Sequence, residues 1–215
     1  IKQGFASIAQ GIPQGIGLAV GNAIIAPLRE LAGVIPAAIN EFKLLDQSIQ
    51  LTLGIAGEGP AKFGELQASI LRVSSASAAT ASEVAGVAQS LAKAGFSFSE
   101  IDSAMAGIVQ GAEATGTAYE AMGSIIVSAM GAWQLEAAES ARVADVLTVA
   151  ANSSNQSVTD LGEALKYVGP VAKATGQSLE DTALALELLA NNGIRGSQAG
   201  TSFRTILTNL QIAAS

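Results

Sequence analysis

The stretch NNGIRGSQAGTSFRTILTNL, residues 191–210, combines closely spaced glycines with an arginine, and glycine-rich loops of this kind can hold phosphate groups. A phosphate-binding loop of the known type follows a strand and carries a lysine directly after its last glycine. Here the preceding residues, EDTALALELLANN, have a helical pattern, and the stretch contains no lysine. We therefore interpret Gly193 as the end of one helix, Ser197 as the cap of the next, and Gly200 as a point of close helix contact, with Gly196 in the same junction.

Carboxylates are the second group that could do chemistry. Glu100 with Asp102, and Glu180 with Asp181, lie next to one another, but on a helix their side chains point in different directions. A glycosidase pair needs one acid in an apolar pocket and a partner several ångströms away across a cleft. The sequence leaves such a pair open, but no feature marks one. We expect no enzyme activity.

The composition excludes other kinds of site. The chain has no histidine and no cysteine, so Ser-His-Asp and Cys-His catalysis, thiolate or imidazole metal sites and disulfides are all ruled out. We therefore predict no catalytic, cofactor-binding or metal-binding residue and no small-molecule substrate.

A repeated start signal for helices runs through the chain after residue 60. Five times a serine or threonine precedes an acidic residue by three positions, so that the hydroxyl can cap the helix while the carboxylate reaches back to the cap amide. These pairs are Thr80/Glu83, Ser97/Glu100, Thr117/Glu120, Ser157/Asp160 and Ser178/Asp181. Gly95, Gly116 and Gly176 come just before three of the caps, and a glycine there can take the left-handed conformation that closes the previous helix.

The sequence predicts an all-α fold: a compact antiparallel helical bundle with short Gly/Ser-capped turns, preceded by an apolar, glycine-rich helical segment. No strand pattern occurs. On α-helical spacing, Val143, Val146, Leu147 and Ala150 share one face of their helix, and Leu184, Leu188 and Leu189 share one face of another. Gly107 and Gly111, four residues apart, favour close helix packing, and Trp133 is expected to be a packing anchor. The predicted helices are 61–74, 81–94, 98–114, 118–131, 136–151, 158–174, 179–191 and 198–212.

Two regions are expected, 1–59 and 60–215. In the first, Gly4 to Leu28 carries no charge over 25 residues, enough as a helix to cross a hydrocarbon core of roughly 30 Å, although Pro13 and Pro27 divide the run. The GxxxG pairs Gly11/Gly15 and Gly17/Gly21 allow a second helix to approach closely. Both interpretations stay open: a membrane-inserting segment, or an alanine- and glycine-rich packing segment.

Charge argues against some partners. Charged residues make up 13% of the chain, about half the level of roughly 25% found in ordinary soluble domains, which suggests surfaces that contact protein or membrane. The net charge is −7, and residues 65–215 hold fourteen acidic against seven basic side chains. We therefore expect no specific binding to nucleic acid.

Residues 141–210 carry the most specific motifs: VADVL, ANSSNQSVTDLGEALKYVGPVA and NNGIRGSQAGTSFRTIL. This region closely resembles the conserved region of tail tape measure proteins, the long-tailed phage minor tail protein family. With the upstream stretch SEVAGVAQSLAKAGFSFSEIDSAMAGIVQGAEATG, the resemblance extends over about residues 65–215.

The resemblance implies a structural virion protein in the tail tube lumen or at the tail tip. Proteins of this family set the length of the tail tube and leave ahead of the DNA to assist genome delivery. The implied partners are tail tube and tail tip or baseplate proteins, further copies of the same chain in a homo-oligomer and, after release, the host inner membrane. The rival hypothesis is a membrane-active, pore-forming protein carried by a soluble helical bundle.

Overall fold

The computed structural model describes residues 43–214, and in these the chain is helical from one end to the other, without a strand. A first helix spans residues 43–56. Two short 3₁₀ helices are η1 (Pro60–Lys62) and η2 (Ala137–Glu139). The α-helices that follow are α3 (Phe63–Ser75), α4 (Ala81–Lys93), α5 (Phe98–Thr115), α6 (Tyr119–Trp133), α7 (Ser140–Asn152), α8 (Val158–Ala174), α9 (Leu179–Asn191) and α10 (Gly196–Ala214). The predicted all-α bundle is confirmed.

Small and aliphatic residues at helical spacing explain why these segments pack as helices. In α5, Ile101, Met105, Ile108 and Ala112 recur at intervals of three or four and are almost completely buried. The same spacing in the other helices builds one continuous apolar core through residues 45–207. Many core positions are alanine, which lets neighbouring helices approach closely.

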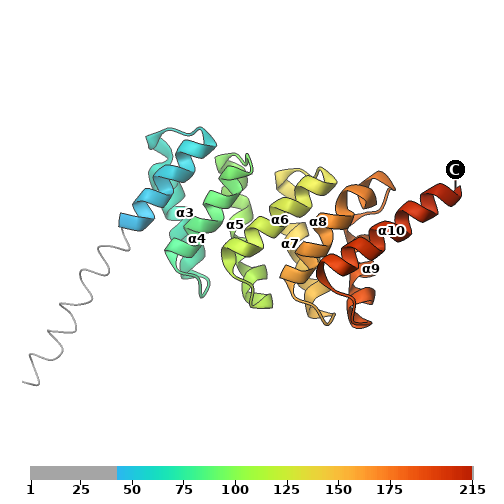
Figure 1. Ribbon diagram of the computed structural model, residues 1–215. Coiled ribbons are helices and arrows are strands. Elements are labelled where there is room, and N and C mark those ends of the chain that lie inside the picture. Colours follow the sequence, from blue (N-terminus) through green and yellow to red (C-terminus); the bar gives the residue numbers. More distant parts are fainter. Residues whose placement is uncertain (1–42, 215) are drawn as a thin grey trace, which may run out of the picture. The chain divides into compact units, whose positions relative to one another are not determined.

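The helices form two layers, because each helix contacts the helix two elements away as well as its neighbour along the chain. One layer is the even layer, α4, α6, α8 and α10, whose members contact one another in that order. The other is the odd layer, α3, α5, α7 and α9, joined in the same way. Figure 1 shows the helices following one another along the stack in chain order. This arrangement is that of helical-repeat proteins, in which each helical hairpin rests on the preceding one.

A compact unit comprises Leu45–Ser215. The helix 43–56 contributes Leu45, Ile49 and Leu53 to the same core as the later helices. The glycines Gly11, Gly15, Gly17 and Gly21 and the uncharged run from residue 4 to residue 28 lie outside the described residues. Within residues 43–214, no helix is both long enough and apolar enough to span a bilayer.

Candidate functional site

Helix caps lie at most of the predicted positions. Thr80 precedes α4, and its hydroxyl accepts a hydrogen bond from the Glu83 N–H at 3.3 Å while the Thr80 N–H donates to Glu83 Oε2 at 2.8 Å. Ser157 forms the same reciprocal pair with Asp160 before α8. Each such pair satisfies two amides that the first turn of a helix leaves without a partner.

Two further serines lie at cap positions. Ser97 donates to Glu100 Oε2 from both its N–H and its hydroxyl, each at 2.7 Å, before α5. Ser178 caps α9, where it accepts from the Asp181 N–H at 3.0 Å.

Thr117 is not a helix cap, so that prediction was wrong. The N-cap of α6 is Ala118, and the helix begins at Tyr119. The Thr117 N–H instead donates to the Ala112 carbonyl, and its hydroxyl is 2.9 Å from the Thr115 hydroxyl. Thr117 therefore belongs to the C-terminal end of α5, and no side-chain hydrogen bond caps the start of α6.

The same junction recurs six times along the stack. In each of these six junctions a residue in the left-handed conformation follows the helix, and the next residue donates its N–H to the carbonyl five positions earlier, which is the Schellman pattern; α3 and α7 end without it. The left-handed residues are Gly57, Gly95, Gly116, Gln134, Gly176 and Gly193. Gln134, with φ of 57°, was not predicted, because glutamine gives no sequence signal for this conformation.

The glycine-rich stretch is a junction between helices in the structure. Gly193, with φ of 87°, follows the end of α9, and the Ile194 N–H donates to the Leu189 carbonyl. The next helix begins at Gly196, so Ser197 lies inside α10 and is not its cap. The first backbone bond of α10 runs from the Ala199 N–H to the Arg195 carbonyl.

Glycines hold the even layer close together. A Cβ added at Gly200 in α10 would collide with the Ala164 carbonyl oxygen of α8 and lie 2.8 Å from the Ala164 Cα. A Cβ at Gly169 in α8 would lie 2.8 Å from the Ala132 Cβ of α6. At Gly162 the neighbour is the Ile125 side chain, at 2.9 Å. Helix α8 therefore approaches α6 and α10 at distances that favour glycine.

In the odd layer, close contact occurs between α5 and α7. A Cβ added at Gly107 would be in ordinary contact with the Ala141 Cβ at 3.5 Å, and one at Gly111 would lie 2.9 Å from the Thr148 hydroxyl. By contrast, α7 and α9 contain no glycine at all.

Trp133 joins α6 to the turn between α8 and α9. Its side chain is 3% exposed, and its indole N–H donates to the Gln177 carbonyl at 3.0 Å. The ring also lies against Gly169. It is a packing anchor with its one polar atom satisfied.

The four carboxylates considered for catalysis are all engaged in structural contacts. Glu100 pairs with Ser97, and Asp181 with Ser178. Asp102 accepts from Ser69 and from Arg72, whose Nη2 is 2.8 Å away, and so ties α5 to α3. Glu180 forms an ion pair with Arg142, which also contacts Glu139. These separate contacts do not bring the four carboxylates together into one site.

The pKa shifts have the same structural origin. The pKa of Glu83 is lowered by the backbone N–H and then by the hydroxyl of Thr80, and that of Glu100 by the hydroxyl and then the N–H of Ser97. Arg142 lowers the pKa of Glu139 through a hydrogen bond. Lowered pKa values keep these acids ionised, which suits a cap or an ion pair but not a general acid.

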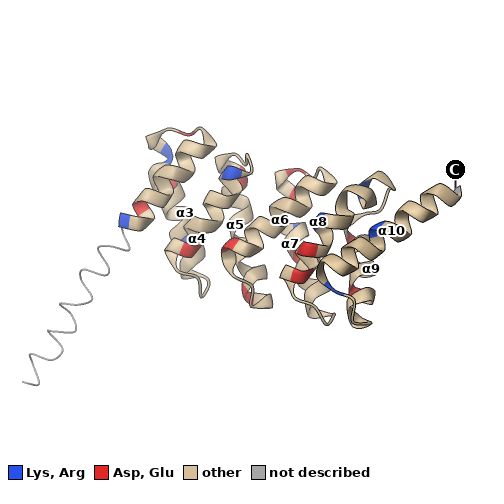
Figure 2. Cartoon of the chain, in the orientation of Figure 1, with Lys and Arg blue, Asp and Glu red and all other residues tan. Residues whose placement is uncertain are grey.

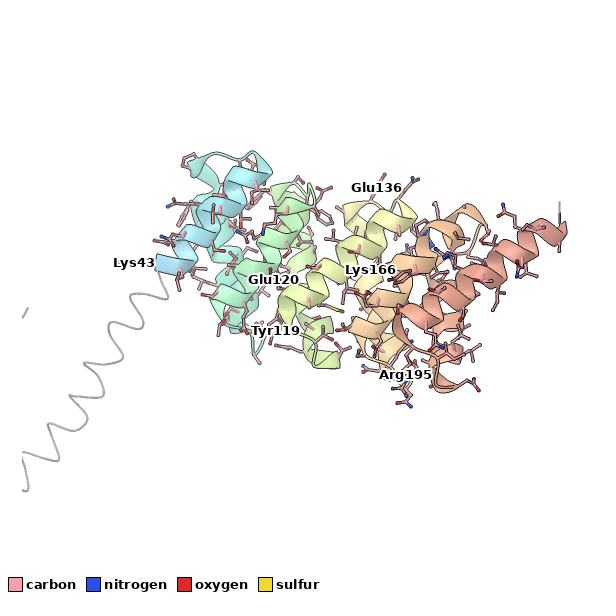
Figure 3. All side chains as sticks on the ribbon, in the orientation of Figure 1. Lys43, Tyr119, Glu120, Glu136, Lys166 and Arg195 are labelled. Carbon is pink, nitrogen blue, oxygen red and sulfur yellow. The ribbon has the colours of Figure 1, made fainter. Side chains whose placement is uncertain are left out.

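Charged residues are scattered along the described helices (Figure 2). Glu136 and Arg195, for example, lie at opposite edges of the stack (Figure 3). In the part of the chain that the structure describes, no three acidic side chains gather in a way that could hold a metal ion.

The exposed face of α9 differs from the prediction. Leu184 and Leu188 are 55% and 60% exposed, and the buried face instead presents Leu179 and Leu186 to the core, with Ala183 between them in the sequence. The leucines of α9 occupy two faces of the helix, so spacing alone did not decide which one is buried.

Comparison with known proteins identifies the family. The family described as phage-related minor tail protein matches residues 67–215. The chain is 35% identical over 196 residues, 91% of its length, to a tape measure protein of Pneumococcus phage Dp-1, and 30% identical over 171 residues, 80% of its length, to a probable tape measure protein of Escherichia phage P2. It spans only 17% and 21% of those two relatives, and no solved structure matches it. The family match covers more than half of the chain, so the chain belongs to the phage-related minor tail proteins and is a phage tail protein.

Proposed function

We propose that the chain is a section of a tape measure protein, which acts in the assembly of the tail and in setting its length. The observation that carries this proposal is the 35% identity to a tape measure protein over 91% of the chain. The structure is compatible with it, because the predicted site residues take part in helix caps, helix ends and helix contacts.

The layered stack is an unsuitable ruler in its folded form. A single extended helix lengthens by about 1.5 Å per residue. In a two-layer stack, a hairpin of roughly 40 residues advances the stack by only about one helix spacing, 8–10 Å. Per residue, the folded stack therefore measures about a sixth of the distance that a straight helix does. We infer that the ruler lies in other parts of the parent protein and that residues 45–215 form a folded assembly or delivery module.

The proposal also assigns partners and a location. The module contacts tail tube, tip or baseplate proteins within the virion tail and leaves with the parent protein ahead of the DNA. Further copies of the parent protein lie beside it in the tail. The expected lack of specific nucleic acid binding stays a prediction from charge.

Tail length tests the proposal. In-frame deletions of increasing size in the parent gene, outside residues 45–215, are expected to shorten the tail by about 1.5 Å per deleted residue in electron micrographs. Viable deletions that leave tail length unchanged would contradict the tape measure role. The control is a second protein of the same phage, one whose length is not expected to set tail length, shortened by the same number of residues.

A further inference from the structure

A groove lies between α7 and α9 on the odd layer. It has a volume of about 330 Å³, and its floor is formed by small and aliphatic residues: Val146 and Ala150 from α7, and Ala183 from α9. Two large apolar side chains at its edges are open to solvent, since Val149 is 65% and Leu184 is 55% exposed. Leu188, one turn after Leu184, extends the apolar surface along α9.

The two helices beside the groove differ from α5 in their glycine content. Between α5 and α7, Gly107 and Gly111 let the two backbones approach, and the layer is closed there. Neither α7 nor α9 contains a glycine, and the groove lies between these two helices. Exposed aliphatic side chains on both walls of a groove are typical of a surface that another protein covers.

The charges at the groove have one sign. Asp145, Glu180 and Glu187 line it, and no lysine or arginine does. Arg142 neutralises Glu180, but neither Asp145 nor Glu187 forms an ion pair with any residue in the described range. Two uncompensated carboxylates therefore flank an apolar floor.

We propose that this groove binds an amphipathic helix of another protein, with aliphatic side chains at intervals of three and four residues and lysine or arginine on either side of them. Two parallel ridges of side chains suit a third helix lying along them, and a bound helix of about three turns matches the length of α7 and α9. Its aliphatic residues cover Val149 and Leu184, and its basic residues pair with Asp145 and Glu187. The inference does not depend on the tape measure role.

The test uses the full 215-residue chain and two synthetic peptides. The first peptide is a helix with leucines on one face flanked by lysines, and the second is identical except that glutamates replace the lysines. Fluorescence anisotropy is expected to show binding of the lysine peptide only, and this binding weakens several-fold when salt is raised from about 0.05 M to about 0.5 M. Equal affinity for both peptides, or binding of neither, would overturn the proposal.

Substitutions in and away from the groove test where the lysine peptide binds. Leu184→Ser is expected to weaken the lysine peptide at least tenfold, whereas the control Leu51→Ser, an equally exposed leucine at 56% on helix 43–56, leaves the affinity unchanged. Glu187→Lys is expected to remove most of the preference for the lysine peptide, because the new ammonium group offsets the carboxylate of Asp145, and it keeps the test decisive if the serine variant unfolds. Equal loss of affinity in both serine variants would rule the groove out. Dimers in sedimentation velocity that Leu184→Ser abolishes would assign the groove to a second copy of the chain and also contradict the proposal.

Discussion

The two layers of the stack are built from the same kind of helix, but their helices pack against one another with different closeness. In the even layer, glycines bring α8 close to α6 and α10 close to α8: a Cβ at Gly169 would lie 2.8 Å from the Ala132 Cβ, and one at Gly200 would collide with the Ala164 backbone. In the odd layer the glycines that face a neighbouring helix lie in α5, where a Cβ at Gly111 would lie 2.9 Å from the Thr148 hydroxyl of α7, whereas α7 and α9 have no glycine and a groove lies between them. Apolar composition alone therefore does not determine how tightly helices pack. Small residues at the facing positions do.

The largest expected effect comes from Gly200→Ala. The new Cβ would meet backbone atoms of Ala164, which cannot rotate away, so α8 and α10 must separate. We expect a loss of about 2–4 kcal/mol in the free energy of unfolding, measured by urea denaturation with circular dichroism.

The control is Gly131→Ala in α6, where a Cβ would meet nothing within 4 Å. This change is expected to stabilise the protein by about 0.5–1 kcal/mol, because alanine favours the helix. Equal effects at the two positions would show that close approach does not hold the even layer together.

Caps are expected to matter equally in the two layers. Ser157→Ala removes the cap of α8 in the even layer, and Ser178→Ala that of α9 in the odd layer. Each is expected to cost about 1 kcal/mol of unfolding free energy in the same denaturation experiment. A much larger loss for one of them would mean that the layers differ in their junctions as well as in their glycines.

A larger side chain can fill the groove between α7 and α9. Ala183→Leu adds apolar volume where α7 and α9 leave about 330 Å³ open. We expect the thermal midpoint to be unchanged or raised, which corresponds to a gain of up to about 1 kcal/mol in the free energy of unfolding. A clear destabilisation would show that α7 and α9 are already closely packed.

Acid is expected to weaken both layers gradually. The folded-state pKa values of Glu83 in α4 and Glu100 in α5 are lowered by their cap partners, so their stabilisation is present above the ordinary value of 4.5 and is lost as the pH falls through the folded-state values. Denaturation midpoints should decrease once the pH is lowered below about 4.5. This decrease should be smaller in Glu83→Gln and in Glu100→Gln. Identical pH profiles in all three proteins would contradict this assignment.

Local signals made much of the fold predictable. The start of α4 follows from Thr80 and Glu83, and the ends of α5 and α8 from Gly116 and Gly176, because caps and left-handed residues act within a few positions of the chain. Where two local signals compete, the sequence misleads. Thr117 has the cap spacing, but its N–H donates to the Ala112 carbonyl at the end of α5, and Ala118 is the N-cap of α6.

Features that depend on distant residues were not predictable. Gly200 was expected to lie at a close contact, but its partner Ala164 is known only from the structure. The buried face of α9 could not be chosen either, because both of its faces carry leucines and the open space beside α7 leaves Leu184 exposed. The groove and its carboxylates therefore have no signature in the sequence alone.

We propose that residues 45–215 work in the tail as a folded stack and not as the ruler. The most direct test is to duplicate the hairpin of residues 97–135, which runs from the cap of α5 to the junction after α6, in the parent gene and to measure tail length by electron microscopy. Because repeat stacks accept an extra unit, a folded stack predicts viable phage whose tails lengthen by about 10 Å or less. Lengthening by about 60 Å, the span of roughly 40 residues in one straight helix, would contradict the claim.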